Sequence, residues 1–386
     1  MPVEVAPAVA ASSTTMEITV SKFELLRELT ATQGVVERKT TIPILSNYLF
    51  EASGDKLSLT ATDLDLSLRT SCHAKVKKEG SCTIPARKLH DYVKLLPDAD
   101  ITIRLLENHW VSIRCGRSNT KMVGMAKSNF PGLPVFPAAG AIKIPASVLR
   151  SMIAKTGFAI ASEESRYTLN GALMVLKPES ITMVATDGHR LAHIERSAEK
   201  FAGVSGEMKT LVPKKAMDEL KSLLDSTDAE EIEFAKDEST LFFRIGQRLL
   251  TSRQLTGQFP NFEAVLPKDN NKSITLHGEE LAAAISRVAQ FADERSRAVK
   301  MRLEKGELKL SASSTETGES EDSLEIDYNG DVIQIGFNAQ YLLDFLKATG
   351  NGDVKLEFKD SQSAGQMRPA EGEEYKYRYI VMPMRI

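Results

Sequence analysis

Hydrophobic and polar residues alternate in three stretches of the chain. In "DKLSLTATDLDLSLRTS" (Asp55–Ser71), apolar residues take every second position on either side of a Thr-Asp pair. "ESITMVATDGHRLAHIE" (Glu179–Glu195) has the same frame, and its first aspartate lies 124 residues later (187 − 63). "GELKLSASSTETGESEDSLEI" (Gly306–Ile326) is a third and degraded copy. A period of two is typical of half-buried strands, so each stretch predicts two strands joined by a turn.

An amphipathic helix follows each of these strand pairs. "CTIPARKLHDYVKLL" (Cys82–Leu96) and "TLVPKKAMDELKSLL" (Thr210–Leu224) share a strand end, a proline, two basic residues and apolar residues at helical spacing. The two prolines lie 128 residues apart (213 − 85). "IQIGFNAQYLLDFLKAT" (Ile333–Thr349) is the third copy, in which Asn338 stands where a helix N-cap is expected.

A third marker closes each unit. "KSNFPGLP" (Lys127–Pro134) matches "TGQFPNFEAVLP" (Thr256–Pro267), with the Phe-Pro pairs 129 residues apart (259 − 130). The final "YIVMPMRI" (Tyr379–Ile386) takes the corresponding place. Because three markers recur in one order at a common spacing, the chain is predicted to be one module repeated three times.

Each module is also predicted to open with a helix that precedes a pair of strands. The expected helices are Lys22–Val35, Ala146–Ile160 and Glu279–Phe291, the first strand pair is Leu45–Ala52 with Leu57–Thr62, and Trp110 is expected to pack on a strand. Every module is therefore α+β, with two helices and roughly eight short strands in antiparallel sheets that bury one face. We expect a flexible tail at residues 1–15 and domains at residues 16–139, 140–270 and 271–386.

Composition agrees with a globular protein of several domains. At 386 residues the chain exceeds one hydrophobic core, and about 150 residues per domain predicts two or three domains. The net charge of -3 does not decide the question of nucleic-acid binding, because a protein can be basic on one surface and acidic elsewhere. Cys72, Cys82 and Cys115 form no C-x-x-C pair, so neither a zinc site nor a disulfide framework is predicted.

The N-terminal segment does not predict a secretory signal. "MPVEVAPAVAASSTT" contains no Lys or Arg and no long apolar core, and Met16 could itself be the start. No part of the chain approaches the ~18 uninterrupted apolar residues of a membrane span. We therefore expect a cytoplasmic protein, with its cysteines reduced and without a membrane partner.

Asp187 and His189, in "MVATDGHRLAHI", admit two interpretations. They could be the acid–base pair of an enzyme, for example a hydrolase, or Asp187 could cap the backbone of a strand–strand turn in which a nearby glycine, two or three residues on, supplies a positive φ. The first module keeps the turn as Asp63-Leu64-Asp65 but has no histidine. No G-x-S-x-G, H-E-x-x-H, P-loop or G-x-G-x-x-G motif occurs. We predict a turn aspartate and a protein that is not an enzyme, with no catalytic residues, metal or cofactor.

The C-terminal residues are unusually apolar for a terminus. Val381–Ile386 includes two methionines beside a proline and an isoleucine. Such residues suit an adaptable groove for short hydrophobic peptides. The alternative is a tail that docks as an edge strand for stability.

Taken together, these motifs resemble those of a known family. "VATDGHRLA", "YTLNGALM", "FPNFEAVLP", "IGFNAQYLLDFL" and "YIVMPMRI" are similar to motifs of the bacterial DNA polymerase III β subunit, the sliding clamp, and the resemblance covers residues 16–386. It implies a non-catalytic processivity factor that tethers the replicative polymerase to DNA. Two chains would close head to tail into a ring, with the helices around a central hole and the sheets outside. The ring would hold duplex DNA without reading its sequence.

The resemblance also implies partners and site residues. The partners would be double-stranded DNA, the α subunit of the replicative polymerase, the clamp loader, and other clamp-binding repair and translesion proteins. The cleft for partner peptides, between the second and third domains, would comprise Leu169, Thr186, Gly188, His189, Arg190, Leu191, Pro260, Val265, Asn338, Tyr341, Met382, Pro383, Met384 and Arg385. The residues facing DNA would be Lys39, Arg87, Lys88, Lys94, Arg166, Tyr167, Lys214 and Lys215. Ala264, Ser296 and Gln362 depart from the residue types common in the family and bear on peptide preference.

The dimer contact would pair "NTKMVGM" (Asn119–Met125) with an edge of the partner's third domain, near Phe291 and Leu303. Met122 and Phe291 are the candidates for its apolar centre, because exposed strand edges invite such pairing.

Basic residues recur on the second helix of two modules, independently of the resemblance. Arg87, Lys88 and Lys94 share the polar side of one helix, and Lys214 and Lys215 recur at the equivalent place. A solvated amphipathic helix can show the same face, but recurrence favours a surface that faces DNA. The remaining alternative is a protein-interaction scaffold that does not bind DNA.

Overall fold

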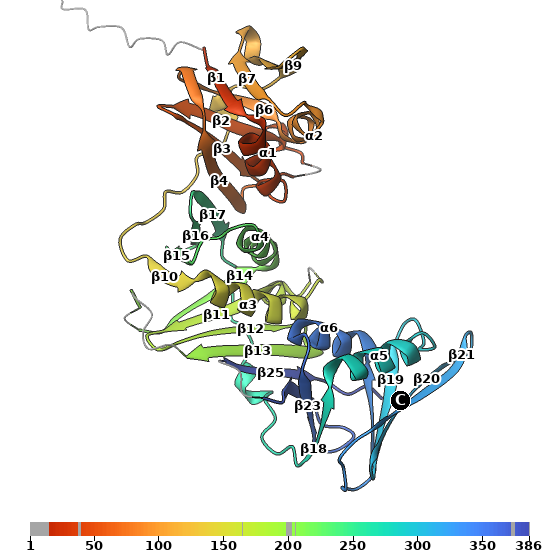
Figure 1. Cartoon of the computed structure of the whole chain (residues 1–386). Coiled ribbons are helices and arrows are strands. Elements are labelled where there is room, and N and C mark those ends of the chain that lie inside the picture. The colour runs from red at the N-terminus through yellow and green to blue at the C-terminus, as the bar shows by residue number, and fades with distance from the viewer. Residues whose placement is uncertain are drawn as a thin grey trace, which may run out of the picture. The chain divides into compact units, whose positions relative to one another are not determined.

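The repeated modules share their sheets, and this sharing divides the chain into two compact units. The computed structural model describes residues 15–37, 40–163, 165–197, 203–204, 206–371 and 375–385 (Figure 1). The first unit comprises residues 1–138 and 233–253, and the second comprises residues 139–232 and 254–386. The first unit thus contains the last strands of the second module, because β17 (Arg248–Arg253) pairs with β4 (Leu66–His73). The predicted tail, residues 1–15, lies outside the described residues except for Thr15.

Antiparallel strands and two helices build the first unit. One sheet has the strand order β5-β1-β7-β8-β9, and the other contains β15-β16-β17-β4-β3-β2-β6. Helices α1 and α2 pack against each other, and Tyr48 and Thr70 reach α1 from the second sheet. Its elements are β1 (Glu17–Ser21), α1 (Lys22–Ala31), β2 (Asn47–Ser53), β3 (Lys56–Thr62), β4, β5 (Lys75–Lys78), β6 (Gly80–Pro85), α2 (Ala86–Leu95), β7 (Asp100–Leu105), β8 (Trp110–Cys115), β9 (Ser118–Val123), β15 (Glu231–Lys236), β16 (Thr240–Ile245) and β17.

The second unit repeats this plan and joins the second and third modules. The order of its larger sheet is β14-β11-β12-β13-β25-β24-β23-β18, and that of its smaller sheet is β21-β20-β19-β22. Helix α3 packs on α4, α5 packs on α6, and α3 also contacts α6. Its elements are β10 (Ile142–Pro145), α3 (Ala146–Thr156), β11 (Gly171–Lys177), β12 (Ser180–Thr186), β13 (Arg190–Ser197), β14 (Met208–Pro213), α4 (Lys214–Asp225), β18 (Lys272–His277), α5 (Gly278–Ala289), β19 (Ala298–Glu304), β20 (Glu307–Ser314), β21 (Gly318–Glu325), β22 (Ile333–Asn338), α6 (Ala339–Thr349), β23 (Asp353–Phe358), β24 (Gly365–Pro369) and β25 (Tyr375–Val381).

The two Thr-Asp pairs form the same hydrogen-bonded turn. In the first module Asp63 Oδ1 accepts from the backbone N of Asp65 (2.9 Å) and Leu66 (2.6 Å), and in the second Asp187 Oδ1 accepts from that of His189 (2.9 Å) and Arg190 (3.0 Å). The residue after each aspartate has a positive φ, 84° at Leu64 and 88° at Gly188. The prediction of a turn-capping aspartate is confirmed, although the positive φ falls directly after the aspartate and not two or three residues later.

The predicted helices begin where expected and end earlier. α1 stops at Ala31 instead of Val35, because the Thr32 hydroxyl donates to the carbonyl oxygens of Glu28 (3.0 Å) and Leu29 (2.9 Å). Such local bonds compete with continuation of a helix. The predicted N-cap of α6 is confirmed, since Asn338 Oδ1 accepts from the backbone N of Gln340 at 2.9 Å.

A buried ion pair ties the first module to the strands of the second within the first unit. Glu28, on α1, is 2% exposed. The Arg248 guanidinium, on β17, donates hydrogen bonds to both carboxylate oxygens of Glu28 at 3.0 and 3.1 Å. The Thr70 hydroxyl donates to the same carboxylate at 2.5 Å. Burial raises the pKa of the Glu28 carboxyl, but the hydrogen bonds from Arg248, Thr70 and Arg27 outweigh it, so the pKa lies below its usual value.

We therefore expect Glu28 to stabilise the chain above its unfolded-state pKa and to lose this contribution as the pH falls through its lower folded-state pKa. Replacing Glu28 with Gln should lower the free energy of unfolding at neutral pH by about 3–5 kcal/mol, because it leaves Arg248 buried without its counter-ion. It should also flatten the decline of stability with acid. Urea titrations at several pH values between neutral and acid measure both effects.

Glu24→Gln, on the same helix, is the matched control. If Glu28→Gln and Glu24→Gln change the free energy of unfolding equally at every pH, the ion pair does not hold α1 to β17.

Candidate functional site

The Asp187 carboxylate is occupied by the turn that it caps. In addition to the two backbone bonds, its Oδ2 accepts from Arg190 Nε at 3.0 Å. The His189 side chain is exposed at the tip of the turn, and its own backbone N is one of the donors to Asp187. The described residues contain no group of three His, Cys, Asp or Glu side chains placed to hold a metal ion. The geometry is that of a structural turn.

The Arg190 side chain points inward and connects several elements. Only 10% of it is exposed. Its guanidinium contacts Asp344 on α6 at 2.5 Å and the carbonyl oxygen of Phe158 at 2.6 Å, and it lies over the Tyr341 ring, 4.4 Å from the centroid. Burial alone would lower the pKa of Arg190, but the charges and hydrogen bonds of its partners raise it. Arg190 is therefore a largely buried residue that links the Asp187 turn to α6.

The C-terminal segment bridges the second and third modules. Met382 N donates to the carbonyl oxygen of His189 at 2.9 Å, and Met384 N donates to that of Gly336 at 2.8 Å. Val381 is 1% exposed, whereas Met382 is 44% exposed. The tail is thus anchored through its backbone like an edge strand and still presents a methionine to solvent. The backbone bonds agree with the edge-strand interpretation, and the peptide groove stays a prediction.

An apolar floor lies beside this segment. Leu191 is 3% exposed, and the half-buried Leu169 packs against the core cluster that contains it. Val265, 44% exposed, follows the short 3-10 helix Phe262–Ala264, and Phe262 packs on the same cluster. The complete cluster consists of Leu173, Val175, Val184, Leu191, Leu211, Phe259 and Ile380.

Some of the remaining predicted cleft residues form structural hydrogen bonds, and others are exposed. Thr186 Oγ1 serves the Asp187 turn by donating to Arg190 O at 2.6 Å, and Asn338 caps α6. Half-buried Tyr341 borders Arg190. Gly188, Pro260 and Arg385 are exposed, and Pro383 and Met384 are half-buried.

Sequence reasoning missed the supports of Arg190. Asp344, Phe158 and Tyr379 come from three distant segments, and Tyr379 donates its hydroxyl to the carbonyl oxygen of Tyr341 at 2.9 Å. The one signal in the sequence is that Arg190 is followed by apolar residues, since a charged side chain among buried apolar residues needs a partner inside the protein.

The equivalent junction of the first and second modules lacks these features. There Arg253 N donates to the carbonyl oxygen of Asp65 at 2.8 Å, which matches the bond from Met382 to His189. Arg253 and Asp65 therefore occupy the positions that correspond to Met382 and His189, and their side chains form an ion pair at 3.5 Å. Leu45, the counterpart of Leu169, is only 3% exposed. The junction of the second and third modules thus exposes Met382 beside His189, whereas the junction of the first and second modules carries an ion pair at the same positions.

The predicted DNA-facing residues fall into three groups. Arg87, Lys88 and Lys94 are exposed on α2, opposite its buried residues. On α4, Lys215 is exposed and Lys214 forms an ion pair with Asp218 at 3.3 Å. Tyr167 is 52% exposed, Arg166 Nη1 donates to the Asp187 carbonyl oxygen, and Lys39 lies outside the described residues.

The predicted dimer residues lie on or near sheet edges. Met122 is half-buried on β9, the terminal strand of its sheet, and Phe291 is half-buried just after α5. Leu303 is fully buried on β19, between β20 and β22, so the terminal strands of that sheet are β21 and β22, and β22 is bridged at Gly336 to Met384.

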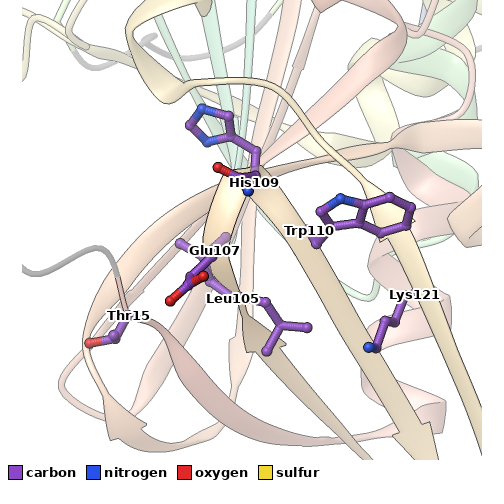
Figure 2. A pocket seen from close by; sticks show the side chains of 8 residues that line it. Thr15, Leu105, Glu107, His109, Trp110 and Lys121 are labelled. Carbon is purple, nitrogen blue, oxygen red and sulfur yellow. The ribbon is translucent and has the colours of Figure 1, made fainter.

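Trp110 lies on a strand, as predicted, but on the strand's exposed face. It is 43% exposed at the start of β8 and pairs with Val123 of β9, which is 54% exposed. Figure 2 shows Trp110 and Lys121 among the residues that line a pocket of about 1000 Å³. The strand turns this position to the solvent face, while its neighbour Val111 is buried.

The fold and site define a class: a protein of three repeated α+β clamp domains, with paired helices and a C-terminal segment that bridges the second and third repeats. Family models agree in each third of the chain. The N-terminal domain of the DNA polymerase III beta subunit matches residues 16–134, its central domain residues 143–261, and its C-terminal domain residues 263–385. The chain belongs to the DNA polymerase III beta subunit family, the beta sliding clamps. As a member of this family it is a non-catalytic processivity subunit, which confirms the prediction that it is not an enzyme.

Similar proteins extend over nearly the whole chain. The beta sliding clamp of Caulobacter vibrioides is 35% identical over 378 residues, covering 96% of this chain and all of the relative, and that of Chlamydia muridarum is 33% identical over 371 residues, covering 96% and 99%. Among solved structures, the Pseudomonas aeruginosa clamp bound to griselimycin has a TM-score of 0.89 at 35% identity, and the Bartonella birtlesii clamp bound to griselimycin has 0.91 at 32%. In both cases 96% of this chain and 100% of the other chain are covered. Among the described residues, no helix is long and apolar enough to cross a membrane.

Proposed function

We propose that two copies of this chain close head to tail into a ring around duplex DNA and that the cleft described above binds peptide segments of the replicative polymerase, the clamp loader and repair proteins. The observation that carries this proposal is the threefold repeat of a family whose members are sliding clamps. A ring retains DNA by topology, so it needs neither a catalytic group nor base contacts. The protein is proposed to act in the cytoplasm.

Basic helices support contact with DNA. Arg87, Lys88 and Lys94 on α2 and Lys214 and Lys215 on α4 occupy equivalent faces of two modules. Lysine and arginine on a smooth helical surface attract phosphates without reading sequence. The guanidinium of Arg166 already contacts the Asp187 turn, so the support for its contact with DNA is weaker. Tyr167 is exposed enough to contact DNA.

Charge complementarity supports a head-to-tail dimer. Arg114, Arg117 and Lys121 are exposed on the hairpin that ends in the edge strand β9. The edge strand β21 carries exposed glutamates at Glu319, Glu321 and Glu325. Pairing of a basic edge with an acidic edge of a second copy is heterologous, and such contacts must close to avoid a filament. Met122 and Phe291 are the proposed apolar centre of this contact.

The proposed domain boundaries remain residues 16–139, 140–270 and 271–386. The family matches, which fall within these three ranges except for residues 263–270, support them. Residues 1–15 precede the first match and are proposed to lie outside the clamp module.

Retention on circular DNA tests the function. The protein, loaded by a clamp loader onto nicked circular DNA, should remain bound through gel filtration and should be released when a restriction enzyme linearises the circle. An ordinary DNA-binding protein would dissociate from both forms at the same rate, and a scaffold that does not bind DNA would be retained on neither. Either result would refute the ring, and a mass of one chain at micromolar concentration would do so as well.

The α4 lysines give a more specific prediction. Lys214→Glu with Lys215→Glu should weaken loading on DNA roughly tenfold and reduce its dependence on salt, because up to two phosphate contacts become repulsive. Binding of a clamp-binding peptide should not change. Electrophoretic loading assays at several salt concentrations and calorimetric titration with the peptide measure the two activities.

The control is Lys143→Glu with Lys359→Glu, the same change of charge at two exposed positions outside the helices. If this variant weakens loading equally, net charge and not the α4 surface controls DNA association. Loss of peptide binding in the α4 variant would indicate misfolding.

A further inference from the structure

A second pocket lies on the face of the first unit's larger sheet that is turned away from α1. One row of side chains crosses four strands of this sheet: Leu49 on β2, Thr60 on β3, Arg69 on β4 and Leu249 on β17 are direct neighbours in register. Above them, the loop Phe130–Phe136 encloses a pocket of about 410 Å³, which we call the row pocket. Its remaining lining residues are Glu51, Lys127 and Arg244.

The second unit contains the same row, with its space filled. There the corresponding neighbours are Leu173, Val184, His193 and Arg378. Phe262 covers them, since its ring lies 5.6 Å from that of His193 and packs on the core cluster. By the repeat, Phe262 corresponds to Leu133, 129 residues earlier (262 − 133), which lines the row pocket and is not part of the small core cluster beside it. The chain itself therefore shows that an aromatic ring fits above such a row.

The row pocket also contains an unpaired polar group. Thr60 is 1% exposed, and its hydroxyl has no hydrogen-bond partner among the described residues. In the second unit a valine, Val184, occupies this place. A buried hydroxyl without a partner costs free energy, and an acceptor on a bound molecule would remove that cost.

The charges of the lining residues favour a ligand that carries negative charge. Arg69, Lys127 and Arg244 line the pocket against one carboxylate, Glu51. Arg244 also forms an ion pair with Glu233 at 2.9 Å, so the local excess is one positive charge (3 − 2). Glu51 is shared by Arg69 at 3.1 Å and Lys127 at 2.7 Å. The Arg244 guanidinium lies over the Phe136 ring, 3.7 Å from its centroid. At the rim, the apolar side chain of Val135 is 87% exposed.

We propose that the row pocket is a second docking site, distinct from the cleft, which binds an extended acidic segment of a partner protein by inserting one aromatic side chain. The ring would cover the row as Phe262 covers its own, a backbone carbonyl oxygen of the segment would accept from the Thr60 hydroxyl, and flanking carboxylates would meet Arg69, Lys127 and Arg244. Val135 would be covered by the bound segment. The site does not depend on the cleft, because the two are built from different units.

Titration of the full-length dimer with the peptide acetyl-Asp-Glu-Phe-Asp-Glu-amide tests the proposal. Methyl NMR signals of Thr60, Val135 and Leu249 should shift saturably. Arg69→Gln with Arg244→Gln should weaken binding ~5-fold or more, as the loss of charge-assisted contacts predicts. The variant that lacks Met382–Ile386 should give the same shifts as the unaltered chain, and a clamp-binding peptide, titrated separately, reports the cleft independently.

Three results would overturn the proposal. One is the absence of saturable shifts at these methyls. Another is equal binding of a peptide in which the phenylalanine is alanine or the acidic residues are lysine. The third is a larger assembly in sedimentation that the peptide dissociates, since the occupant would then be a second copy of this chain.

Discussion

Deletion of Met382–Ile386 is expected to lower the affinity for a clamp-binding peptide of the replicative polymerase by at least ~100-fold, which corresponds to about 2.7 kcal/mol. The segment contributes Met382, the exposed apolar side chain beside Leu191, and it spans from the carbonyl oxygen of His189 to that of Gly336. Its removal therefore opens one wall of the cleft. Isothermal titration calorimetry with the peptide measures the loss.

The deletion should leave the dimer folded. Val381, the last residue of β25, is buried and retains its pairing with Arg190, so the sheet keeps its register. Circular dichroism and sedimentation should match those of the unaltered chain. Deletion of Arg385 and Ile386 alone is the matched control, because it spares both methionines and both backbone bonds, and it should retain most of the affinity. Unchanged affinity after the longer deletion would place the peptide elsewhere.

The threefold repeat could be predicted because it is a local property of the sequence. Alternation around Thr62-Asp63 and Thr186-Asp187 determines strands on both sides of a turn, and the hydrogen bonds of Asp63 and Asp187 are made within three residues. The N-cap at Asn338 is equally local. Where only neighbours in the chain matter, pattern and structure agree.

Sharing of sheets between modules could not be predicted in the same way. The pairing of β4 with β17 joins Leu68 to Leu250, and that of β13 with β25 joins Leu191 to Ile380. No periodicity within a module indicates which distant strand completes its sheet. For this reason the sequence shows three modules while the contacts form two compact units.

The direction in which the polar side chains of the site point could not be predicted from the sequence either. Arg190 follows an exposed histidine and is expected from the sequence to line the peptide cleft, whereas its guanidinium is bonded to Asp344 and to the Phe158 carbonyl oxygen. Arg166, which is expected to face DNA, donates a hydrogen bond to the Asp187 carbonyl oxygen, a contact that the sequence did not indicate. In both cases a long side chain reaches a partner that the fold supplies from far along the chain.

Replacement of Arg190 with methionine is expected to lower the free energy of unfolding by about 3–5 kcal/mol, the range for breaking a buried ion pair. Methionine retains much of the apolar stem but leaves Asp187 and Asp344 without their shared cation, and these side chains are only 15% and 22% exposed. Urea denaturation at a fixed protein concentration measures the change, because the stability of a dimer depends on concentration. Arg190→Lys should recover only part of the loss, since an ammonium cannot replace a planar fork that bonds Asp187, Asp344 and the Phe158 carbonyl oxygen together.

The repeat supplies the matched control for this prediction. Arg253→Met removes the arginine of the other module junction, where the pair with Asp65 is 73% and 76% exposed, so its cost should stay below ~1 kcal/mol. Arg190 also links the Asp187 turn to α6, which carries Tyr341. Its loss should therefore weaken peptide binding even where the protein remains folded, while the Arg253 variant binds normally. Equal stability of the two variants would mean that apolar packing alone stabilises this region. The charge of Arg190 would then contribute nothing to the free energy of unfolding.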